Sequence, residues 1–323
     1  MIEPLTDDEL TFFEEGQTCC FSCKKWFDMQ GQPPLMEYTC DTCGDTVITP
    51  LRISTFWLYK LIGEGGMGHV YLAQQKDDPK MYAIKIADIV DGDDFRYNCL
   101  LYEGEIYMGF SHPNIPEAYN AGHKIGLAFL IMDYEPGENL EEYMCNPENF
   151  PVSEPLLLTW MSQLADALKY MISKGYIYRD MKPQNLVVDG EKIVITDMGL
   201  AMHLDHGNDI DEDNFVGSPW FLPPERIEGE QEDIRSDIYS LGMVMFMAAA
   251  GFSYFDEPDH MKVLDLHILP ERVPVKEIYA DISDGFAAIL DKCIQRFPKD
   301  RYQTYEDLEA DINALKSGVS VAS

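Results

Sequence analysis

The run from Tyr178 to Asn185 constrains this chain most, because it places polar side chains at a spacing that suits one kind of chemistry. Asp180 can accept the proton of a hydroxyl group, and Lys182 can offset charge on a phosphoryl group in transfer. Asn185, together with Asp197 in a downstream Asp-Met-Gly triplet, can hold Mg²⁺ against the phosphates of ATP. The spacing therefore predicts a phosphoryl-transfer site.

These two motifs resemble the catalytic loop and the metal-binding motif of eukaryotic-like (Hanks-type) Ser/Thr protein kinases of the bacterial type. The chain departs from the family at Tyr178, where the family has His, and at Met198, where it has Phe. Both replacements are large and partly or wholly apolar, so we expect them to keep the family's internal hydrophobic column.

The resemblance covers residues 56–316 and implies an α+β, bilobal protein-kinase fold. We expect a small β-rich N-lobe over about 56–132, a hinge at about 133–137 and a mainly helical C-lobe over about 138–316. Residues 317–323 are expected to form a tail.

A glycine-rich segment, Gly63-Glu64-Gly65-Gly66-Met67-Gly68-His69-Val70, precedes the catalytic motifs. Dinucleotide-binding folds use a similar pattern, but there it leads from a strand into a helix. Here β-prone residues flank it on both sides, which predicts strand–loop–strand, the kinase form. The resemblance assigns Gly63, Gly65, Gly68 and Val70 to ATP binding.

The next strand is expected at residues 81–86 and carries Ala83 and Lys85, which match the family's Val-Ala-Ile-Lys motif. By resemblance, Ala83 lies in the ATP site and Lys85 contacts the α- and β-phosphates. Glu103, on a helix expected at roughly 94–110, is the partner that the resemblance gives to Lys85. Glu105 is the alternative, and the two cannot both face Lys85 because a helix turns about 100° per residue.

Residues 127–135 are expected to form the strand that enters the hinge. Alignment with the family places Met132 at the gatekeeper position. The backbone groups of Asp133 and Glu135 would then bond adenine.

The C-lobe should begin with a helix over 155–174, and Asp189-Gly190 predicts a hairpin that follows Asn185. By resemblance, Glu225 pairs with Arg301, and Ser218 bonds Asp180 and Lys182 to help seat an acceptor hydroxyl.

Asp237 allows two interpretations. It is a plausible helix N-cap, while in the family the corresponding residue braces the backbone near the catalytic loop.

The stretch between Asp197 and Ser218 contains no Ser, Thr or Tyr, and residues 209–213 are mostly acidic. In many relatives a phosphate here pairs with the arginine that corresponds to Arg179. We therefore hypothesise that a carboxylate from Asp209 to Asp213 occupies Arg179 instead. A solvated acidic loop is the alternative.

Residues 1–50 predict a zinc-ribbon-like module, with loose residues at 1–16. Two Cys-x-x-Cys knuckles supply Cys20, Cys23, Cys40 and Cys43, a spacing that suits four-thiolate Zn²⁺. Rubredoxin-type iron sites share the pattern, and Cys19 is a spare thiol beside a ligand. The module carries two lysines and ten acids, a net charge of −8, which disfavours nucleic acid. Protein docking, a structural role or sensing remain open.

The net charge of −33 also disfavours anionic membranes and favours basic protein substrates or a salty environment, with simple solubility as the alternative. With no targeting or transmembrane segment in the sequence, a cytoplasmic protein is expected, of an oligomeric state that the sequence leaves open. The resemblance implies a signalling protein Ser/Thr kinase that uses ATP, Mg²⁺ (or Mn²⁺) and Zn²⁺. The alternatives are a pseudokinase scaffold that recruits partners through the module, and a small-molecule phosphotransferase.

Overall fold

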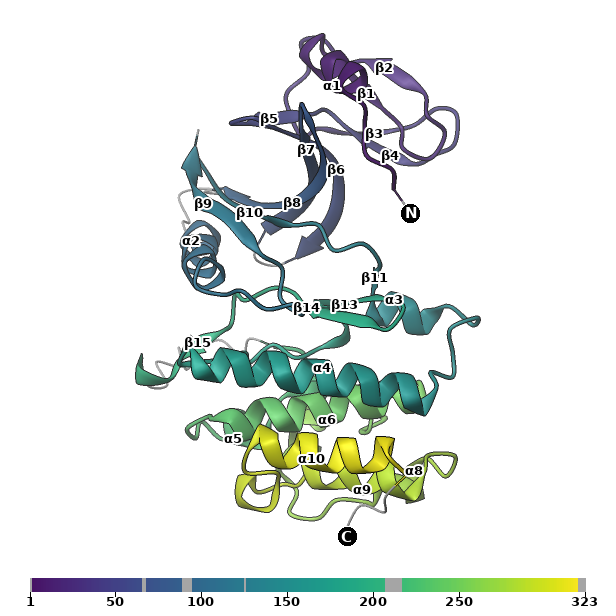
Figure 1. Cartoon of the computed structure of the whole chain (residues 1–323), viewed down its shortest axis with the longest axis vertical. Helices are drawn as coiled ribbons and strands as arrows, with labels where there is room; N and C mark the ends of the chain where they lie inside the picture. The colour runs from purple at the N-terminus through teal and green to yellow at the C-terminus, as the bar shows by residue number, and fades with distance from the viewer. Residues whose placement is uncertain (1, 66–67, 89–94, 125, 207–216, 319–323) are drawn as a thin grey trace. The chain divides into compact units, whose positions relative to one another are not determined.

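The computed structural model describes residues 2–65, 68–88, 95–124, 126–206 and 217–318, which form two compact units (Figure 1). The N-terminal unit comprises the chain as far as Ser111 together with Pro116–Glu135. The C-terminal unit comprises His112–Ile115 and the chain from Pro136 onward.

The N-terminal unit is built on a six-stranded antiparallel sheet in the order β5-β6-β7-β8-β10-β9, and helix α2 packs on it (Figure 1). The sheet is preceded by α1 and two short hairpins, β1-β2 and β3-β4. The elements are α1 (Asp7–Glu14), β1 (Gln17–Cys19), β2 (Trp26–Asp28), β3 (Glu37–Thr39), β4 (Thr46–Ile48), β5 (Leu51–Ile53), β6 (Phe56–Gly65), β7 (Gly68–Gln75), β8 (Asp78–Asp88), α2 (Phe95–Tyr107), β9 (Ala118–Lys124) and β10 (Leu127–Asp133).

The glycine-rich segment joins two paired strands, as predicted. β6 and β7 are antiparallel, and their last pair is Gly65 with Gly68. Gly68 has φ +135°, and a Cβ there would lie 2.4 Å from the backbone oxygen of Ile86. Only glycine fits at this position, because a side chain would clash with the neighbouring strand.

The expectation of a loose segment at residues 1–16 was wrong. Thr6 and Glu9 form a capping box that begins α1, a sequence signal that the analysis missed. Leu10 and Phe13 are buried on this helix and share a hydrophobic core with Tyr59 of β6. The Tyr59 ring stacks on the rings of Phe13 and Phe21, with centroids 5.7 and 5.1 Å away.

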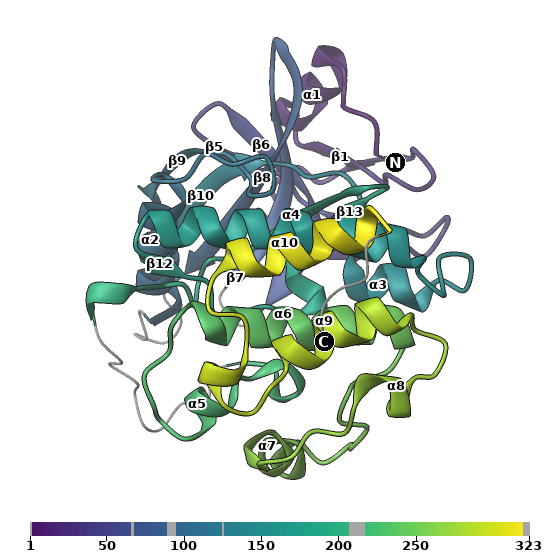
Figure 2. The same ribbon diagram turned by 60° about the horizontal axis from the view of Figure 1, so that its bottom comes forward.

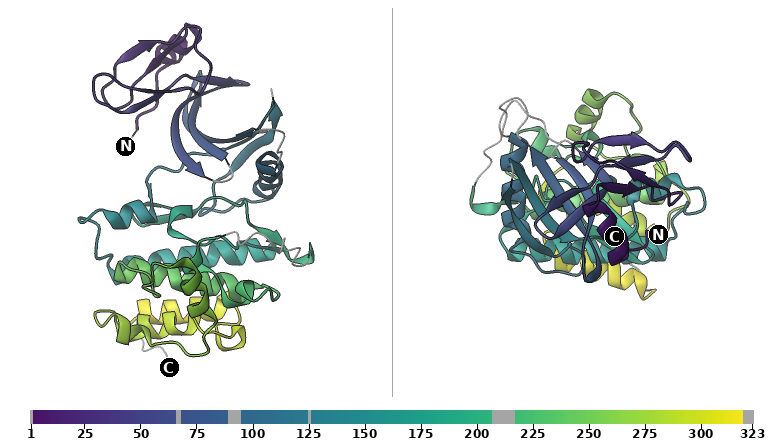
Figure 3. Two further views of the ribbon diagram at one scale, coloured as in Figure 1. Left: turned by 180° about the vertical axis from the view of Figure 1, so that it is seen from behind. Right: turned by 90° about the horizontal axis from the view of Figure 1, so that it is seen from above.

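The N-terminal segment also hydrogen-bonds to the sheet. The buried side chain of Gln74 on β7 accepts from the Leu5 N–H at 2.9 Å and donates to the Leu5 carbonyl at 2.8 Å. The residues before β5 therefore share a core with Tyr59 of β6 and Leu72 of β7 and hydrogen-bond to Gln74 of β7 (Figure 3).

The C-terminal unit is mainly helical, and α4, α6, α9 and α10 run side by side (Figure 2). Its elements are β11 (Glu138–Asn139), α3 (Leu140–Cys145), α4 (Glu154–Ser173), β12 (Tyr176–Ile177), β13 (Leu186–Asp189), β14 (Lys192–Ile195), β15 (Met202–His203), α5 (Pro224–Ile227), α6 (Ile234–Ala250), α7 (His260–Ile268), α8 (Val275–Ile278), α9 (Asp284–Cys293) and α10 (Tyr305–Lys316).

Helix α6 is buried along most of its length, which is why its apolar residues show little helical periodicity. Asp233 is its N-cap, closing a capping box with Ser236. The interpretation of Asp237 as the cap was therefore wrong, and its carboxylate is free to bind elsewhere.

The predicted hairpin is present, with Asp189 paired to Lys192 across the turn of β13 and β14. The backbone N–H and the hydroxyl of Thr196 both donate to the carbonyl of Asn185, at 2.8 and 3.0 Å. This pairing fixes Asn185 beside the residue that precedes Asp197.

Candidate active site

The carboxylate of Asp180 is held on one side only. Its Oδ2 accepts from the Lys182 ammonium at 2.7 Å and from Asn185 Nδ2 at 2.7 Å. Nδ2 also donates to the Asp180 carbonyl at 3.0 Å. Among the described residues no donor reaches Oδ1, so this oxygen can take the proton of an acceptor.

Asn185 uses its amide nitrogen on Asp180, and no donor in the described part of the chain bonds its amide oxygen. Asp197 has φ +61° and accepts from the Gly199 N–H at 3.1 Å. An amide oxygen and a carboxylate are oxygen ligands of the kind that Mg²⁺ prefers. These two residues can thus hold Mg²⁺.

Tyr178 and Met198, the two departures from the family motifs, are fully buried. The Tyr178 hydroxyl also donates to the Thr196 carbonyl at 2.7 Å. This bond, which the sequence did not reveal, ties the catalytic loop to the residue before Asp197.

The backbone of the catalytic loop is hydrogen-bonded to Asp237 of α6. Its two carboxylate oxygens accept from the backbone N–H groups of Tyr178 and Arg179, both at 2.8 Å. Burial raises the pKa of Asp237 to about 6, although the two N–H groups favour the carboxylate. At neutral pH the group is therefore ionised, and it braces the loop in the way that the resemblance implied.

Arg179 is bound by a residue that the sequence analysis did not single out. Its Nε and Nη2 lie 2.9 and 2.8 Å from Oε1 of Glu232, whose side chain is fully buried. The acidic residues expected to occupy Arg179, Asp209 to Asp213, lie outside the described residues. No local pattern marks Glu232, because its neighbours in sequence are also acidic.

Glu225 and Arg301 form a buried two-pronged ion pair, with both N–O distances 2.8 Å. Burial by itself raises the pKa of Glu225, but the hydrogen bonds and charge of Arg301 outweigh it and lower the pKa overall. By contrast, within the described residues the Ser218 side chain makes no hydrogen bond to Asp180 or Lys182.

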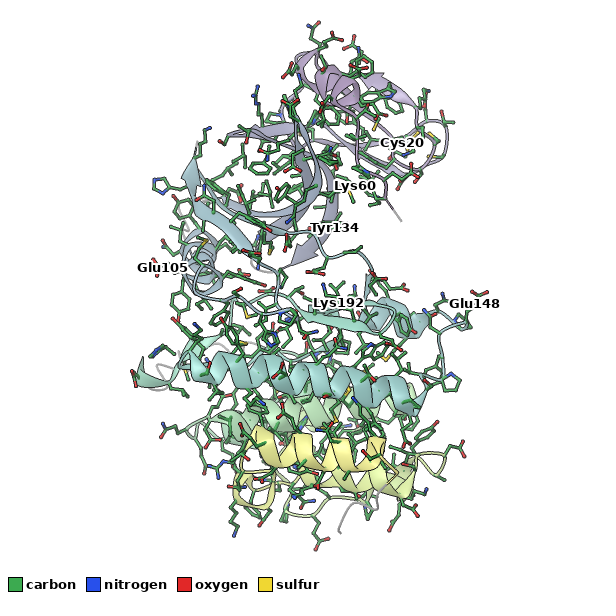
Figure 4. The ribbon with its side chains drawn as sticks, in the orientation of Figure 1. Cys20, Lys60, Glu105, Tyr134, Glu148 and Lys192 are labelled. Atoms are coloured by element: carbon green, nitrogen blue, oxygen red, sulfur yellow. The ribbon has the colours of Figure 1, made fainter. Side chains whose placement is uncertain are left out.

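In the N-terminal unit Lys85 of β8 meets Glu103 of α2, with 2.7 Å between Nζ and Oε2. Both side chains are buried, at 5% and 1% exposure, so the pair is shielded from solvent. Glu105 is exposed and points from α2 away from the sheet (Figure 4). The helix thus presents Glu103 to the lysine, as expected, and not the alternative.

Gly63 and Gly65 differ from Gly68 in what surrounds them. A Cβ on Gly63 would make only ordinary contacts with Val70, and one on Gly65 would meet none of the described residues within 4 Å. Packing against the described part of the chain therefore does not require glycine at 63 and 65. Close approach of a ligand to the backbone would require it.

The residues assigned to adenine lie at the end of β10. Ala83 and Met132 are buried and face each other across β8 and β10. The N–H of Asp133 donates to the Glu117 carbonyl at 2.9 Å, which removes this donor from any adenine contact. Glu135 is half-buried, two residues beyond the strand.

The four predicted cysteines converge at one point, with all four sulfur atoms within 4.8 Å of one another; Figure 4 labels one of them, Cys20. Sγ of Cys20 is 3.4 Å from that of Cys43, and Sγ of Cys23 is 3.6 Å from that of Cys40. A zinc tetrahedron with bonds of about 2.3 Å places its sulfur atoms about 3.8 Å apart, so the four sulfur atoms are close enough together to surround one such ion. Cys19 lies outside the cluster and packs in the apolar core with Tyr59.

The two knuckles have the same backbone form. The N–H of Lys24 donates to the Cys20 carbonyl, and the N–H of Gly44 donates to the Cys40 carbonyl, both at 2.8 Å. Lys24 and Gly44 both have positive φ, at 60° and 79°. The repeated turn aims both sulfur atoms of each knuckle at the same point.

The family description "Protein kinase domain" matches residues 56–311 of the chain. Serine/threonine-protein kinase PrkC of Bacillus subtilis is 31% identical over 265 residues, covering 81% of this chain and 40% of that protein. Serine/threonine-protein kinase PknB of Mycolicibacterium smegmatis is 29% identical over 280 residues, covering 84% of this chain and 44% of that protein.

The chain thus spans about two fifths of the length of the curated relatives it matches. Within the described ranges, no helix combines the length and the apolar character needed to cross a bilayer.

Proposed function

Because the chain belongs to the protein kinase family, we propose that it transfers the γ-phosphoryl group of ATP to Ser or Thr hydroxyls of proteins. The observation that carries this proposal is the Asp180 carboxylate, held through Oδ2 by Lys182 and Asn185 with Oδ1 left to an acceptor. The relatives PrkC and PknB, both named serine/threonine-protein kinases, support the same acceptor class.

In the proposed reaction, the acceptor hydroxyl gives its proton to Oδ1 of Asp180 as its oxygen forms a bond to the γ-phosphorus. The bond from that phosphorus to the β,γ-bridging oxygen breaks, and ADP leaves. Lys182 offsets negative charge on the transferred group. Asn185 and Asp197 would hold Mg²⁺, which neutralises phosphate charge when bound.

The N-terminal unit would orient the triphosphate. Lys85 is aimed by its buried pair with Glu103, so its ammonium is positioned before ATP binds. The backbone at Gly63 and Gly65 is bare of side chains and can approach phosphate oxygens, with Val70 on the paired strand. Ala83, Met132, Asp133 and Glu135 are the residues proposed to line the adenine site.

Ser218 and Lys182 are the residues that favour a Ser or Thr acceptor over Tyr. Their role follows from the family resemblance, and the Ser218 hydroxyl would engage Asp180 or Lys182 only with a substrate bound. With 57 acidic and 24 basic residues, the chain should prefer basic protein substrates over nucleic acids or anionic membranes.

We also propose that Cys20, Cys23, Cys40 and Cys43 hold one Zn²⁺. The four sulfur atoms lie close enough together to surround one ion. Because thiolate ligands persist in a reducing compartment, we propose the cytoplasm. Residues of the N-terminal module share a core with Tyr59 of β6. Of the possible roles of the metal, we therefore propose a structural one.

The first prediction concerns phosphoryl transfer. With Mg²⁺ and γ-labelled ATP, the wild-type chain should label a basic protein substrate on Ser or Thr, and Asp197→Asn should abolish the label because a proposed metal ligand is lost. Phosphoamino-acid analysis reads the acceptor. ATP binding without label would indicate a pseudokinase scaffold, and label on small molecules alone would indicate a small-molecule phosphotransferase.

The second prediction concerns the aiming of Lys85. Glu103→Gln should lower kcat/KM by about 10²-fold, because an unaimed lysine misplaces the triphosphate. Glu105→Gln, two residues along the same helix, is the matched control and should leave kcat/KM unchanged. Equal effects of the two substitutions would show that the pair with Glu103 does not position Lys85 for the reaction.

The third prediction concerns the metal. Elemental analysis of the purified chain should find zinc at about one ion per chain, and Cys43→Ser should lose it, while Cys145→Ser keeps it. A chelator should lower the melting temperature of the wild type, because the metal module shares a core with the sheet. Iron with visible absorbance would instead indicate a rubredoxin-type centre, and full zinc in Cys43→Ser would rule out the proposed ligand set.

A further inference from the structure

Arg179 directly precedes the proposed catalytic base, and each of its backbone polar groups, as well as its guanidinium, has a partner from the segment between α5 and α6 or from those helices. In many relatives the arginine at the position of Arg179 pairs with a phosphate on the stretch between Asp197 and Ser218. We propose that Glu232 is a positioning residue that takes over the role of this phosphate, so that the catalytic loop is ordered without phosphorylation. This inference rests on the proposed kinase function.

Glu232 is enclosed by two guanidinium groups. Oε1 accepts from Nε of Arg179 at 2.9 Å and forms an ion pair with Nη2 of the same residue at 2.8 Å. Oε2 accepts from Nε and Nη2 of Arg226, at 2.9 and 2.6 Å. The Glu232 side chain has 0% exposure, and those of Arg179 and Arg226 have 19% and 8%. A single buried carboxylate thus pairs with two arginines at once.

The second arginine connects this carboxylate to the backbone beside Asp180. Nη1 of Arg226 donates to the carbonyl of Arg179 at 2.7 Å. The N–H of Arg179 donates to Asp237 at 2.8 Å. Both ends of the Arg179 residue are therefore fixed, and Glu232 orients the guanidinium that fixes one of them.

The backbone of Arg179 needs this support because it has φ +71°, a left-handed conformation that is costly for a residue with a side chain. Such a conformation persists only where the surroundings enforce it. If Arg226 loses its carboxylate partner, its hold on the Arg179 carbonyl weakens and the loop can relax. Asp180 would then move from its working position.

Among the described residues, each of the three guanidinium nitrogens of Arg179 already has a partner. Two of its three nitrogens bind Glu232, and the third, Nη1, lies 3.6 Å from the sulfur of Met202. The sequence agrees, because residues 198–217 contain no Ser, Thr or Tyr that could carry a phosphate. In this account the buried carboxylate of Glu232 supplies the negative charge that phosphorylation would otherwise add.

The test compares Glu232→Gln with two controls. Gln keeps the shape of Glu but removes the charge that both arginines need. Glu271→Gln removes an exposed carboxylate from the same unit and controls for net charge. A triple variant, Asp209→Asn with Asp211→Asn and Asp213→Asn, tests whether the acidic loop serves Arg179 instead. Each protein is treated with a protein phosphatase before kcat and the KM for ATP are measured.

We expect the phosphatase-treated wild type to keep its full activity. Glu232→Gln should lower kcat by about 10²-fold with the KM for ATP nearly unchanged, because the catalytic base moves while the groups proposed to contact ATP stay in place. Glu232→Asp should recover part of the loss, and the two control variants should match the wild type.

A mutant cycle separates positioning from simple loss of folding. If Glu232 acts through Arg179 and Arg226, adding Glu232→Gln to the double variant Arg179→Met with Arg226→Met should cause no further loss of kcat. Additive losses, or unchanged kcat in a folded Glu232→Gln protein, would overturn the proposal. The proposal would also be overturned if phosphatase treatment removed the activity of the wild type. It would likewise be overturned if the acidic-loop triple variant lost activity while Glu232→Gln kept it. A wild type that labels no protein under any treatment would instead reject the proposed function.

Discussion

The left-handed backbone conformation of Arg179 is the constraint on which the C-terminal unit's proposed catalytic residues depend. It turns the chain so that Asp180 follows in a fixed direction, and it is held by acids and bases that come from far along the sequence. Asp237 accepts two backbone N–H groups of the loop, and Arg226 donates to the Arg179 carbonyl. Because these partners are buried, their hydrogen bonds are shielded from water and losing one partner leaves another unsatisfied.

Each compact unit fixes the side chains of its own part of the proposed site. In the C-terminal unit the hairpin of β13 and β14 places Asn185 beside the residue before Asp197. In the N-terminal unit the buried pair of Lys85 and Glu103 fixes the lysine ammonium. Rigid placement of this kind lowers the entropy that the reaction must lose. The four-cysteine module adds to the same unit by sharing its core with β6.

Much of this could be predicted from the sequence because the motifs are local and ordered. The glycine segment, the Asp189-Gly190 hairpin and the spacing of Asp180 and Asn185 each depend on a few consecutive residues. Glu232 could not be predicted, because its role depends on Arg179, 53 residues earlier in the chain. The helix within residues 1–16 was missed for a different reason. Its capping box at Thr6 can be recognised in the sequence, but the packing of the helix against Tyr59 cannot.

Amide hydrogen exchange resolved to single residues tests the central claim most directly, because it reads the bonds that hold the catalytic loop. The account predicts that the N–H groups of Tyr178 and Arg179 exchange as slowly as those of buried helix α6. In Asp237→Asn these two should exchange much faster while α6 stays protected. Rapid exchange of both groups in the wild type would contradict the account, since the loop would then not be fixed by the buried acid.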